Sequence, residues 1–333
     1  MTPPPVIRLR DLTHHYGRTV GVDGLDLDVH AGEVFGFLGP NGAGKTTTIR
    51  LLLDLIRPGR GSAELFGRPV RESAGRSRLG YLPGELVLDG RMRGTETLRF
   101  LERLGDAAGS RVGLADRRDA GHGAVDTTHP PAIERRRAEL CERLGMGPRD
   151  LRRRVREYSR GMKQKLGLVA AFQHDPELLV LDEPTTGLDP LVREVVFELL
   201  AEAKRRGRTV FLSSHVLSEV ERTCDRVGML KAGRLVALLR VEDARRATVR
   251  RMVVDFEEPV APESLSVSGI EVVESHGRRM VLRVRGTPDR LLRVLAEHPV
   301  RHLAFPEPTL EDAFASYYRD DDGDPSAPPT PAS

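Results

Sequence analysis

The chain has 333 residues, with 39% hydrophobic and 30% charged side chains, which is the balance of a soluble globular protein and excludes a disordered or fibrous one. Its 52 basic and 49 acidic side chains leave a formal net charge of +3, so we expect no nucleic acid partner. Cys141 and Cys224 do not suggest a disulfide framework or a cysteine zinc site, and no apolar run approaches the roughly 20 residues of a membrane span, which predicts a cytoplasmic protein that reaches a membrane only through a partner.

Strand patterns and one helix open the chain. Apolar and basic residues alternate at 7–10 and a short alternating pattern repeats at 20–29, which predicts an antiparallel pair of strands. The apolar run 34–38 then enters a glycine-rich turn, and residues 47–56 have helical periodicity that ends at the run Arg-Pro-Gly, 57–59. We therefore expect strand, loop and helix in succession.

The same alternation of strand and helix returns later in the chain. The apolar run 178–181 predicts a buried strand, Pro190 suits the first turn of a helix that ends at Gly207, and residues 209–212 predict another strand. Strands that alternate with helices predict a parallel sheet covered by helices, with ligand sites at the carboxyl ends of the strands.

The middle and the end of the chain have different patterns. The region from Leu98 to Arg154 is predicted to be helical, but residues 105–131 are rich in Gly, Ala, Asp and Arg, and we interpret most of them as a flexible insertion. Residues 241–319 predict a separate, small α+β domain, and the acidic, then Pro/Ser-rich residues 320–333 predict a disordered tail. The domain's predicted elements are strands at 252–256, 280–284 and 300–305 and helices at 289–297 and 309–318.

A glycine-rich run with a lysine lies between the strand at 34–38 and the helix that follows, and it matches the phosphate-binding loop. Its glycines let backbone N–H groups wrap the phosphates, and the helix start adds the positive end of its dipole. Lys45 supplies a point charge to the β and γ phosphates of ATP, and Thr46 offers a hydroxyl to Mg²⁺. The predicted nucleotide-binding residues of this run are Gly39, Pro40, Asn41, Gly42, Ala43, Gly44, Lys45, Thr46 and Thr47.

Two adjacent carboxylates end the apolar strand at 178–181. Strand alternation points them differently, so Asp182 suits the Mg²⁺ shell and Glu183 suits the catalytic base for the water that attacks the γ-phosphate. An apolar strand that ends in acids is also a common strand-end turn. Its pairing with the phosphate-binding loop favours the catalytic interpretation.

The run Tyr-Ser-Arg-Gly-Met-Lys-Gln at 158–164 opens a predicted helix, and it resembles the signature motif of ATP-binding cassette (ABC) ATPases. The resemblance implies that Ser159 and the backbone of Gly161 bind the γ-phosphate held by the opposite subunit. Without the other motifs, the same serine would be a plain helix N-cap.

The resemblance to ABC ATPases extends over about residues 6–239, with the motifs in family order. It implies an α/β fold of the P-loop NTPase type within residues 1–240: a parallel-sheet core, an antiparallel β subdomain and a helical subdomain at about 84–165.

Three further positions match the family one by one. Tyr16 resembles the aromatic that stacks on adenine, Asp189 belongs to a loop that resembles the one crossing the dimer interface, and His215 resembles the catalytic γ-phosphate sensor. From the residues alone, Tyr16 is equally a packing aromatic, and a lone histidine after a strand is more often structural. His14 and His15 are predicted on opposite strand faces and are given no role.

Two positions depart from the family pattern. Gly84 stands where the family usually has a glutamine that touches Mg²⁺ and signals to the membrane subunit. The neighbouring Glu85 is either a substitute metal ligand or a solvated loop carboxylate, because a carboxylate is a suitable hard ligand for Mg²⁺. Arg160 replaces a common glycine of the signature motif.

The end of the second domain, residues 308–314, is similar to the accessory domain of exporter ATPases of the daunorubicin- and bacitracin-resistance type. The resemblances together imply an ATP-hydrolysing subunit that uses ATP and Mg²⁺. It would pair with a second copy, or with another ABC ATPase, at the inner face of the cell membrane. There it would drive export of a drug, antibiotic or lipid through a permease of about six transmembrane helices.

The alternative is a soluble ABC ATPase that acts on ribosomes, DNA or complex assembly. Such proteins typically carry two cassettes in one chain or a long coiled coil, and this sequence has neither.

Overall fold

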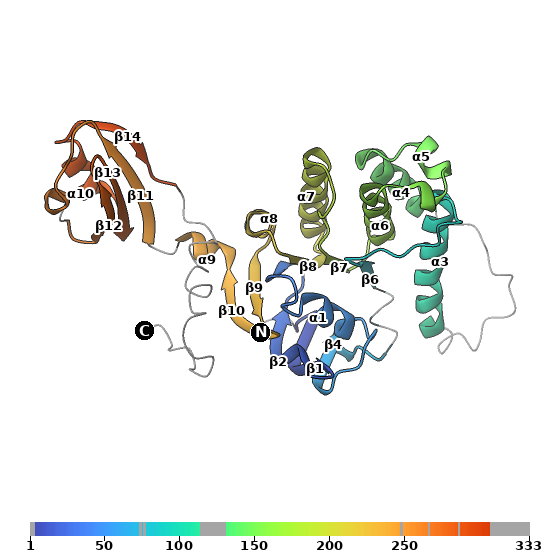
Figure 1. Cartoon of the computed structure of the whole chain (residues 1–333). Helices are drawn as coiled ribbons and strands as arrows, with labels where there is room; N and C mark the ends of the chain where they lie inside the picture. Colours follow the sequence, from blue (N-terminus) through green and yellow to red (C-terminus); the bar gives the residue numbers. More distant parts are fainter. Residues whose placement is uncertain are drawn as a thin grey trace, which may run out of the picture. The chain divides into compact units, whose positions relative to one another are not determined.

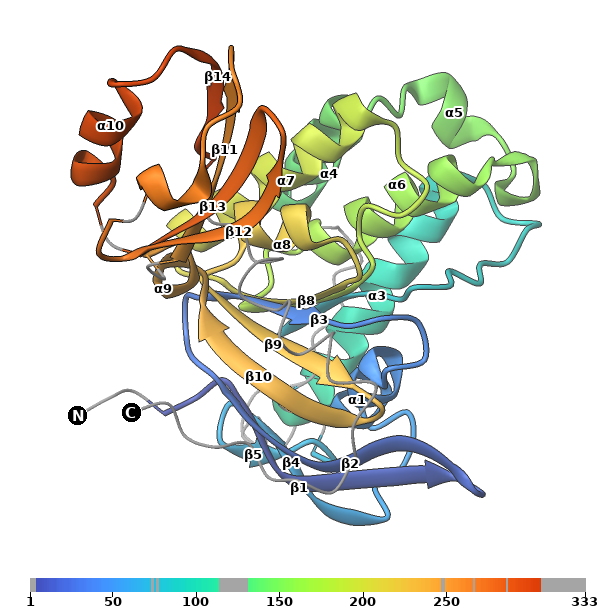
Figure 2. The same cartoon turned by 60° about the vertical axis from the view of Figure 1, so that its left-hand side comes forward.

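The computed structural model describes residues 4–72, 75, 78–113, 131–246, 249–265, 267–285 and 287–306. The chain divides into two compact units, Met1–Leu238 and Leu239–Ser333. Figures 1 and 2 show the described elements of both units. The helix predicted at 309–318 and the tail predicted at 320–333 lie outside the described residues. No helix among the described residues is both long and apolar enough to cross a membrane.

The first unit begins with an antiparallel sheet, as the alternation at its start predicted. Its first two strands pair along most of their length, from Ile7 opposite Val29 to Tyr16 opposite Thr19. Alternate side chains of the first strand, among them Leu9, are buried, because successive residues of a strand face opposite sides. The sheet has the order β2-β1-β4-β5, with β1 Ile7–Tyr16, β2 Thr19–Val29, β4 Arg60–Leu65 and β5 Arg68–Pro69.

A second sheet carries the parallel strands predicted from the apolar runs. Every residue of β3, β7 and β8, three of its four inner strands, is buried, which is typical of parallel strands covered on both faces. Phe35 stacks on Phe211 of the neighbouring strand with ring centroids 5.7 Å apart. The order is β10-β9-β3-β8-β7-β6, with β3 Val34–Leu38, β6 Leu79–Leu82, β7 Leu178–Asp182, β8 Thr209–Ser214, β9 Arg226–Lys231 and β10 Arg234–Arg240.

Helices cover both faces of the parallel sheet. Helix α1, Lys45–Leu52, contacts β2, β4 and β7, so it lies between the two sheets in one shared hydrophobic core. It begins two residues earlier than predicted and ends at Leu52, since Asp54 takes a left-handed conformation with φ 59° that a helix does not tolerate. Helices α7, Pro190–Arg205, and α8, Leu217–Thr223, pack on the other strands.

The helices between β6 and β7 pack against one another (Figure 1). Helices α3 and α4 pack against α6, and a buried ion pair between Arg137 and Glu102 joins α4 to α3. Residues 105–113 of the predicted flexible insertion are helical, because α3 continues through two alanines, the strongest helix formers; residues 114–130 lie outside the described part. The elements are α3 Gly94–Gly113, α4 Pro131–Arg143, α5 Pro148–Arg152, the 3-10 turn η1 Val155–Glu157 and α6 Arg160–Phe172.

The described part of the second unit is a four-stranded antiparallel sheet with helical segments, in the order helix, strand, short helix, two strands, helix, strand. Met252, Leu282 and Leu291 belong to its own hydrophobic core. The strand β12 was not predicted, because its apolar residues are interrupted by glutamates. The order is β12-β13-β11-β14, with α9 Val241–Arg246, β11 Val249–Phe256, η2 Pro262–Leu265, β12 Ile270–His276, β13 Arg279–Arg285, α10 Asp289–Leu295 and β14 Val300–Ala304.

Candidate nucleotide site

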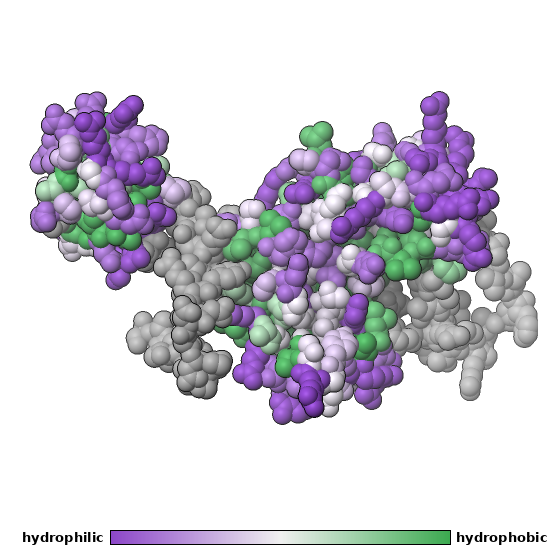
Figure 3. All heavy atoms as spheres, in the orientation of Figure 1, coloured by the Kyte–Doolittle hydropathy of each residue, from purple (hydrophilic) through white to green (hydrophobic). Residues whose placement is uncertain are grey.

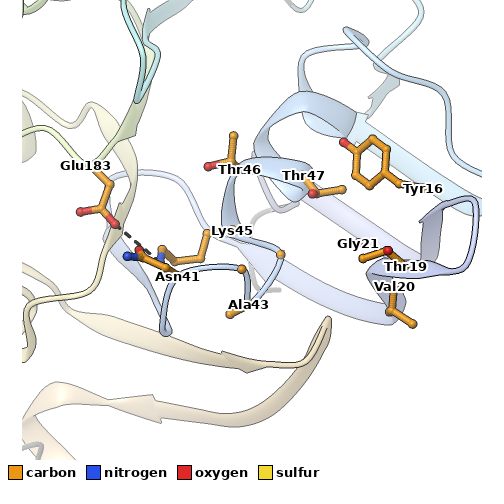
Figure 4. A pocket seen from close by; sticks show the side chains of 12 residues that line it. Tyr16, Thr19, Val20, Gly21, Asn41, Ala43, Lys45, Thr46, Thr47 and Glu183 are labelled. Carbon is orange, nitrogen blue, oxygen red and sulfur yellow. Dashed lines mark ion pairs between the residues drawn. The ribbon is translucent and has the colours of Figure 1, made fainter.

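A cavity of about 270 Å³ opens where β3 enters α1. Tyr16 lies on one side of it and Glu183 on the other, with the phosphate-binding loop between them (Figure 4). Seven residues of the predicted run line the cavity together with a segment of β2 that the sequence did not single out. The lining residues are Tyr16, Thr19, Val20, Gly21, Asn41, Gly42, Ala43, Gly44, Lys45, Thr46, Thr47 and Glu183.

Two glycines of the loop occupy positions that no larger residue fits. Gly44 has a φ of 108°, and a Cβ on it would lie 2.3 Å from the carbonyl oxygen of Gly21. A Cβ on Gly39 would lie 2.4 Å from the carbonyl oxygen of Leu230. The loop is therefore clamped between β2 and the end of β9, which fixes its backbone at the mouth of the cavity.

Lys45 folds back over the loop. Its ammonium group donates hydrogen bonds to the carbonyl oxygens of Gly39, at 2.6 Å, and Pro40, at 3.2 Å. The Nζ atom also lies 3.5 Å from Oε1 of Glu183, and the side chain is only 7% exposed. A cation is thus held at the loop by groups that phosphate oxygens can replace.

Thr46 and Asp182 meet at the carboxyl end of β7. The threonine hydroxyl donates to Oδ2 of Asp182 at 2.9 Å, and Ser213 donates to the other carboxylate oxygen. Asp182 is 1% exposed. A hydroxyl beside one buried carboxylate fits Mg²⁺, which takes oxygen ligands and completes its shell with water and phosphate oxygens. Ser213 was missed, although it ends a predicted neighbouring strand at the same edge of the sheet.

Glu183 follows in a strained conformation. Its φ is 52°, a left-handed value that is rare outside glycine, and its N–H donates to Ser213 Oγ at 3.1 Å. The turn points the carboxylate into the cavity, where Oε2 lies 2.7 Å from Nδ1 of His215. The structure thus brings together the two predicted catalytic residues, which are 32 positions apart in the sequence.

Tyr16 stands at the other side of the cavity with its ring 45% exposed. Its ring and that of His14 pack in a T-shaped arrangement, with ring centroids 4.6 Å apart. Next to it, a Cβ on Gly21 would lie 2.9 Å from a methyl group of Thr47, so this segment of β2 closes tightly on α1. The glycine at the start of a strand was the sequence signal for this close approach.

The two residues at the position of the missing glutamine differ in their surroundings. A Cβ on Gly84 would lie 2.9 Å from Oδ2 of Asp182, so the backbone of Gly84 adjoins the carboxylate. Glu85 is exposed and makes no hydrogen bond or ion pair with the residues that the structure describes. Burial, together with the Asp182 carboxylate, raises the pKa of the adjacent Tyr81 to about 12, which keeps its hydroxyl protonated.

The signature residues do not line the cavity of their own chain. Ser159 caps α6 and accepts a hydrogen bond from Met162 N at 3.2 Å. Gly161 lies close to the backbone of Gly187: a Cβ on Gly161 would be 3.0 Å from the carbonyl oxygen of Gly187. Asp189 caps α7 with a 3.0 Å bond from Val192 N. These three predicted nucleotide contacts therefore form a second group, apart from the cavity.

Gln164 connects the two groups and was not predicted as a site residue. It is 7% exposed, and its Nε2 donates to the carbonyl oxygens of Glu183, at 3.2 Å, and Pro184, at 3.1 Å. The signature helix thereby holds the backbone of the turn that carries the catalytic carboxylate candidate. Its place at the end of the signature run was the only sequence signal.

Known proteins share both sequence and fold with this chain. A family model described as ABC transporter matches residues 22–186. The Nod factor export ATP-binding protein I of Cupriavidus pinatubonensis is 36% identical over 93% of this chain and 89% of that protein. The bacitracin transport ATP-binding protein BcrA of Bacillus licheniformis is 37% identical over 69% of this chain and 68% of that protein.

An uncharacterized ABC transporter ATP-binding protein of Nostoc is 37% identical over 70% of this chain and 66% of that protein. Among solved structures, the ATP-binding subunit of an ABC transporter aligns with a TM-score of 0.60 and 30% identity over 72% of this chain and 92% of that one. The chain belongs to the ABC transporter ATP-binding proteins and is an ATPase of that family.

Proposed function

We propose that this ATPase is the motor of an exporter, in which two copies enclose two ATP molecules and drive a separate membrane permease. One observation carries the pairing: the cavity holds the Lys45 cation and the Glu183 carboxylate, while Ser159 and Gly161 lie outside it in the same chain. A site that needs both groups is complete only when a second copy supplies its signature loop. Sharing of this kind leads to a twofold-symmetric dimer.

The chemistry proposed for each site follows from the contacts in the cavity. Lys45 exchanges its carbonyl partners for the β and γ phosphates and neutralises charge as the terminal bond breaks. Glu183 accepts the proton of the attacking water, and His215 orients its carboxylate through the 2.7 Å contact. Thr46 and Asp182 would hold Mg²⁺, which supplies charge stabilisation to the phosphates.

Adenine would stack on the exposed Tyr16, and the cap at Ser159 would present its hydroxyl and the start of α6 to the γ-phosphate of the partner's ATP.

The direction of transport and the membrane partner are inferred from the relatives. The names of two of them state Nod factor export and bacitracin transport. We propose export through a permease of about six transmembrane helices, with the ATPase at the cytoplasmic face of the membrane.

The pairing is tested with Glu183→Gln, which keeps the shape of the side chain but removes the base. In the presence of ATP and Mg²⁺, light scattering should report a stable dimer, and hydrolysis should fall by ~100-fold or more. Glu177→Gln, which alters an exposed carboxylate next to β7, is the matched control and should leave the monomer–dimer equilibrium unchanged. A Glu183→Gln protein that stays monomeric with ATP would contradict the shared site.

A further inference from the structure

The turn between β7 and α7 begins with Glu183 and ends with Asp189. Glu183 is the proposed base, and its left-handed backbone, with a φ of 52°, persists only where surrounding contacts hold it in place. Gln164 and Ser213 hold this first residue of the turn, through hydrogen bonds to its carbonyl oxygen and from its N–H. The middle of the turn has a separate anchor.

That anchor is a carboxylate on α8, the helix that follows His215. Glu219 lies in the first turn of α8, and its Oε2 atom accepts a hydrogen bond of 2.6 Å from the hydroxyl of Thr185. Both groups are shielded from solvent, because Thr185 is buried and the side chain of Glu219 is only 13% exposed. A hydrogen bond to a carboxylate is stronger than one between neutral groups, so this contact ties the turn firmly to α8.

Arg193 links the same carboxylate to the far end of the turn. Its Nη1 atom lies 3.9 Å from Oε1 of Glu219, and its Nε atom donates to the carbonyl oxygen of Leu188 at 3.1 Å. Leu188 directly precedes Asp189, the residue that caps α7. Glu219 thus holds one end of the segment 185–188 directly and the other end through Arg193.

The two loops that Glu219 joins also carry the residues that meet in the nucleotide cavity. Glu183 follows β7 and His215 follows β8, and Oε2 of the glutamate lies 2.7 Å from Nδ1 of the histidine. The paired register of the two strands ends at Asp182 opposite Ser213, before either residue is reached. Contacts beyond the end of the sheet therefore decide how the two side chains meet.

We propose that Glu219 is a positioning residue for ATP hydrolysis, which holds the segment 185–188 so that the carboxylate of Glu183 meets the attacking water. This inference rests on the proposed function, which makes Glu183 the base. Thr186 connects the segment to the base, because its hydroxyl lies 3.5 Å from Oε2 of Glu183. Glu219 itself does not line the nucleotide cavity, so its loss should slow the chemical step and leave the binding of ATP unchanged.

Steady-state ATP hydrolysis by the full chain tests the proposal with three single variants. In Glu219→Ala, kcat should fall by ~10- to 100-fold while the KM for ATP stays within about twofold of the wild type. Glu219→Gln keeps an oxygen that accepts a hydrogen bond from Thr185, so it should recover most of the lost activity. Thr185→Val removes the same hydrogen bond from the other side with little change in shape, and it should lower kcat as Glu219→Ala does.

The matched control removes a different carboxylate that joins the same two helices. Hydrophilic side chains cover much of the face drawn in Figure 3, and exposed ion pairs among such groups contribute little to stability. Glu194 and Arg222 form an exposed pair of this kind between α7 and α8. Glu194→Ala should therefore leave kcat and KM unchanged. Melting curves measured by circular dichroism establish that every variant is folded at the assay temperature.

A double variant shows whether Glu219 acts through the base. The single-turnover rates of Glu183→Gln and Glu183→Gln/Glu219→Ala should differ by less than about twofold, since no base is left to position. The proposal is overturned if Glu219→Ala slows the wild type and Glu183→Gln by the same factor, or if Glu219→Ala and Thr185→Val leave kcat unchanged. If Glu183→Gln itself keeps the wild-type rate, the proposed function fails instead, because Glu183 is then not the base.

Discussion

The cavity around the phosphate-binding loop and the signature loop at the start of α6 contain comparable polar groups but differ in how those groups are satisfied. In the cavity, Lys45 contacts Glu183, and Thr46 donates a hydrogen bond to Asp182. The cation, the hydroxyl and the two carboxylates are therefore already engaged with one another. At the signature loop, Ser159 bonds only the backbone of its own helix. The first region is arranged to exchange internal partners for a ligand, and the second is arranged to receive one from outside.

Because of this difference, substitutions in the two regions should impair different steps. A change in the cavity should weaken the binding of ATP to the single chain. A change in the signature loop should leave that binding intact and affect only what two chains do together. Substitutions in each region, and in the glutamine that connects them, test the comparison.

The largest effect is expected from Lys45→Ala. Without the ammonium group, the phosphates lose the one side-chain cation among the described residues that line the cavity, so ATPase activity should fall by ~1,000-fold and nucleotide affinity should fall as well. Steady-state ATP hydrolysis and fluorescence titration with a nucleotide analogue measure the two losses. Lys204→Ala is the control, because Lys204 pairs with Asp225 and does not line the cavity. If Lys45→Ala keeps its affinity for the nucleotide, this cavity is not the site that binds the phosphates.

A smaller loss is expected from Ser159→Ala. The hydroxyl makes one hydrogen bond to a charged group in the proposed dimer, so activity should fall by ~10- to 100-fold while a single chain binds ATP as before. The helix loses its cap, which should lower the melting temperature slightly.

Mixing the Lys45→Ala and Ser159→Ala proteins sharpens this test. A mixed dimer contains one site with the intact loop of one chain and the intact signature of the other. Random pairing should therefore restore activity to about a quarter of the wild type. No recovery on mixing would show that the two regions act within one chain.

Gln164→Leu should have the smallest effect. The leucine fills the space but no longer holds the carbonyl oxygens of Glu183 and Pro184, so the carboxylate is less well placed and kcat should fall about tenfold. The KM for ATP should stay unchanged, because Gln164 does not line the cavity. Gln173→Leu is the control: it is equally buried at the end of α6 but bonds Arg137 and Leu98, so it should lower stability and leave kcat alone. If Gln164→Leu and Gln173→Leu lower kcat equally, Gln164 contributes to stability and does not position Glu183.

Local patterns predicted the strands β1, β2, β3, β7 and β8 of the first unit, but not β4, β5, β6, β9 or β10. The continuous apolar runs at 34–38 and 178–181 became buried parallel strands, because only strands covered on both faces have such runs. The run from Gly39 to Thr46 was recognisable because phosphate binding demands glycines and a lysine at fixed spacing. The catalytic role predicted for His215 came from the family resemblance and not from the residues alone, and its contact with Glu183 was not predicted.

Contacts between segments that are distant in the sequence could not be predicted. Nothing local indicates that Gln164 reaches the backbone of Glu183, that Ser213 bonds Asp182, or that Gly84 packs against the same carboxylate. The strand β12 was missed because its glutamates pair with arginines of neighbouring strands, which one strand's pattern does not reveal. The end of α1 depended on a single left-handed residue, Asp54.

The left-handed backbone of Glu183 has a consequence for any attempt to make this protein more heat-resistant. A glycine at that position would relieve strain on the order of 1 kcal/mol and would also abolish the proposed base. Stability and turnover therefore favour different residues at one position, and a selection for thermal tolerance alone would tend to discard the carboxylate. A stabilised variant that still turns over would have to gain its stability at other positions.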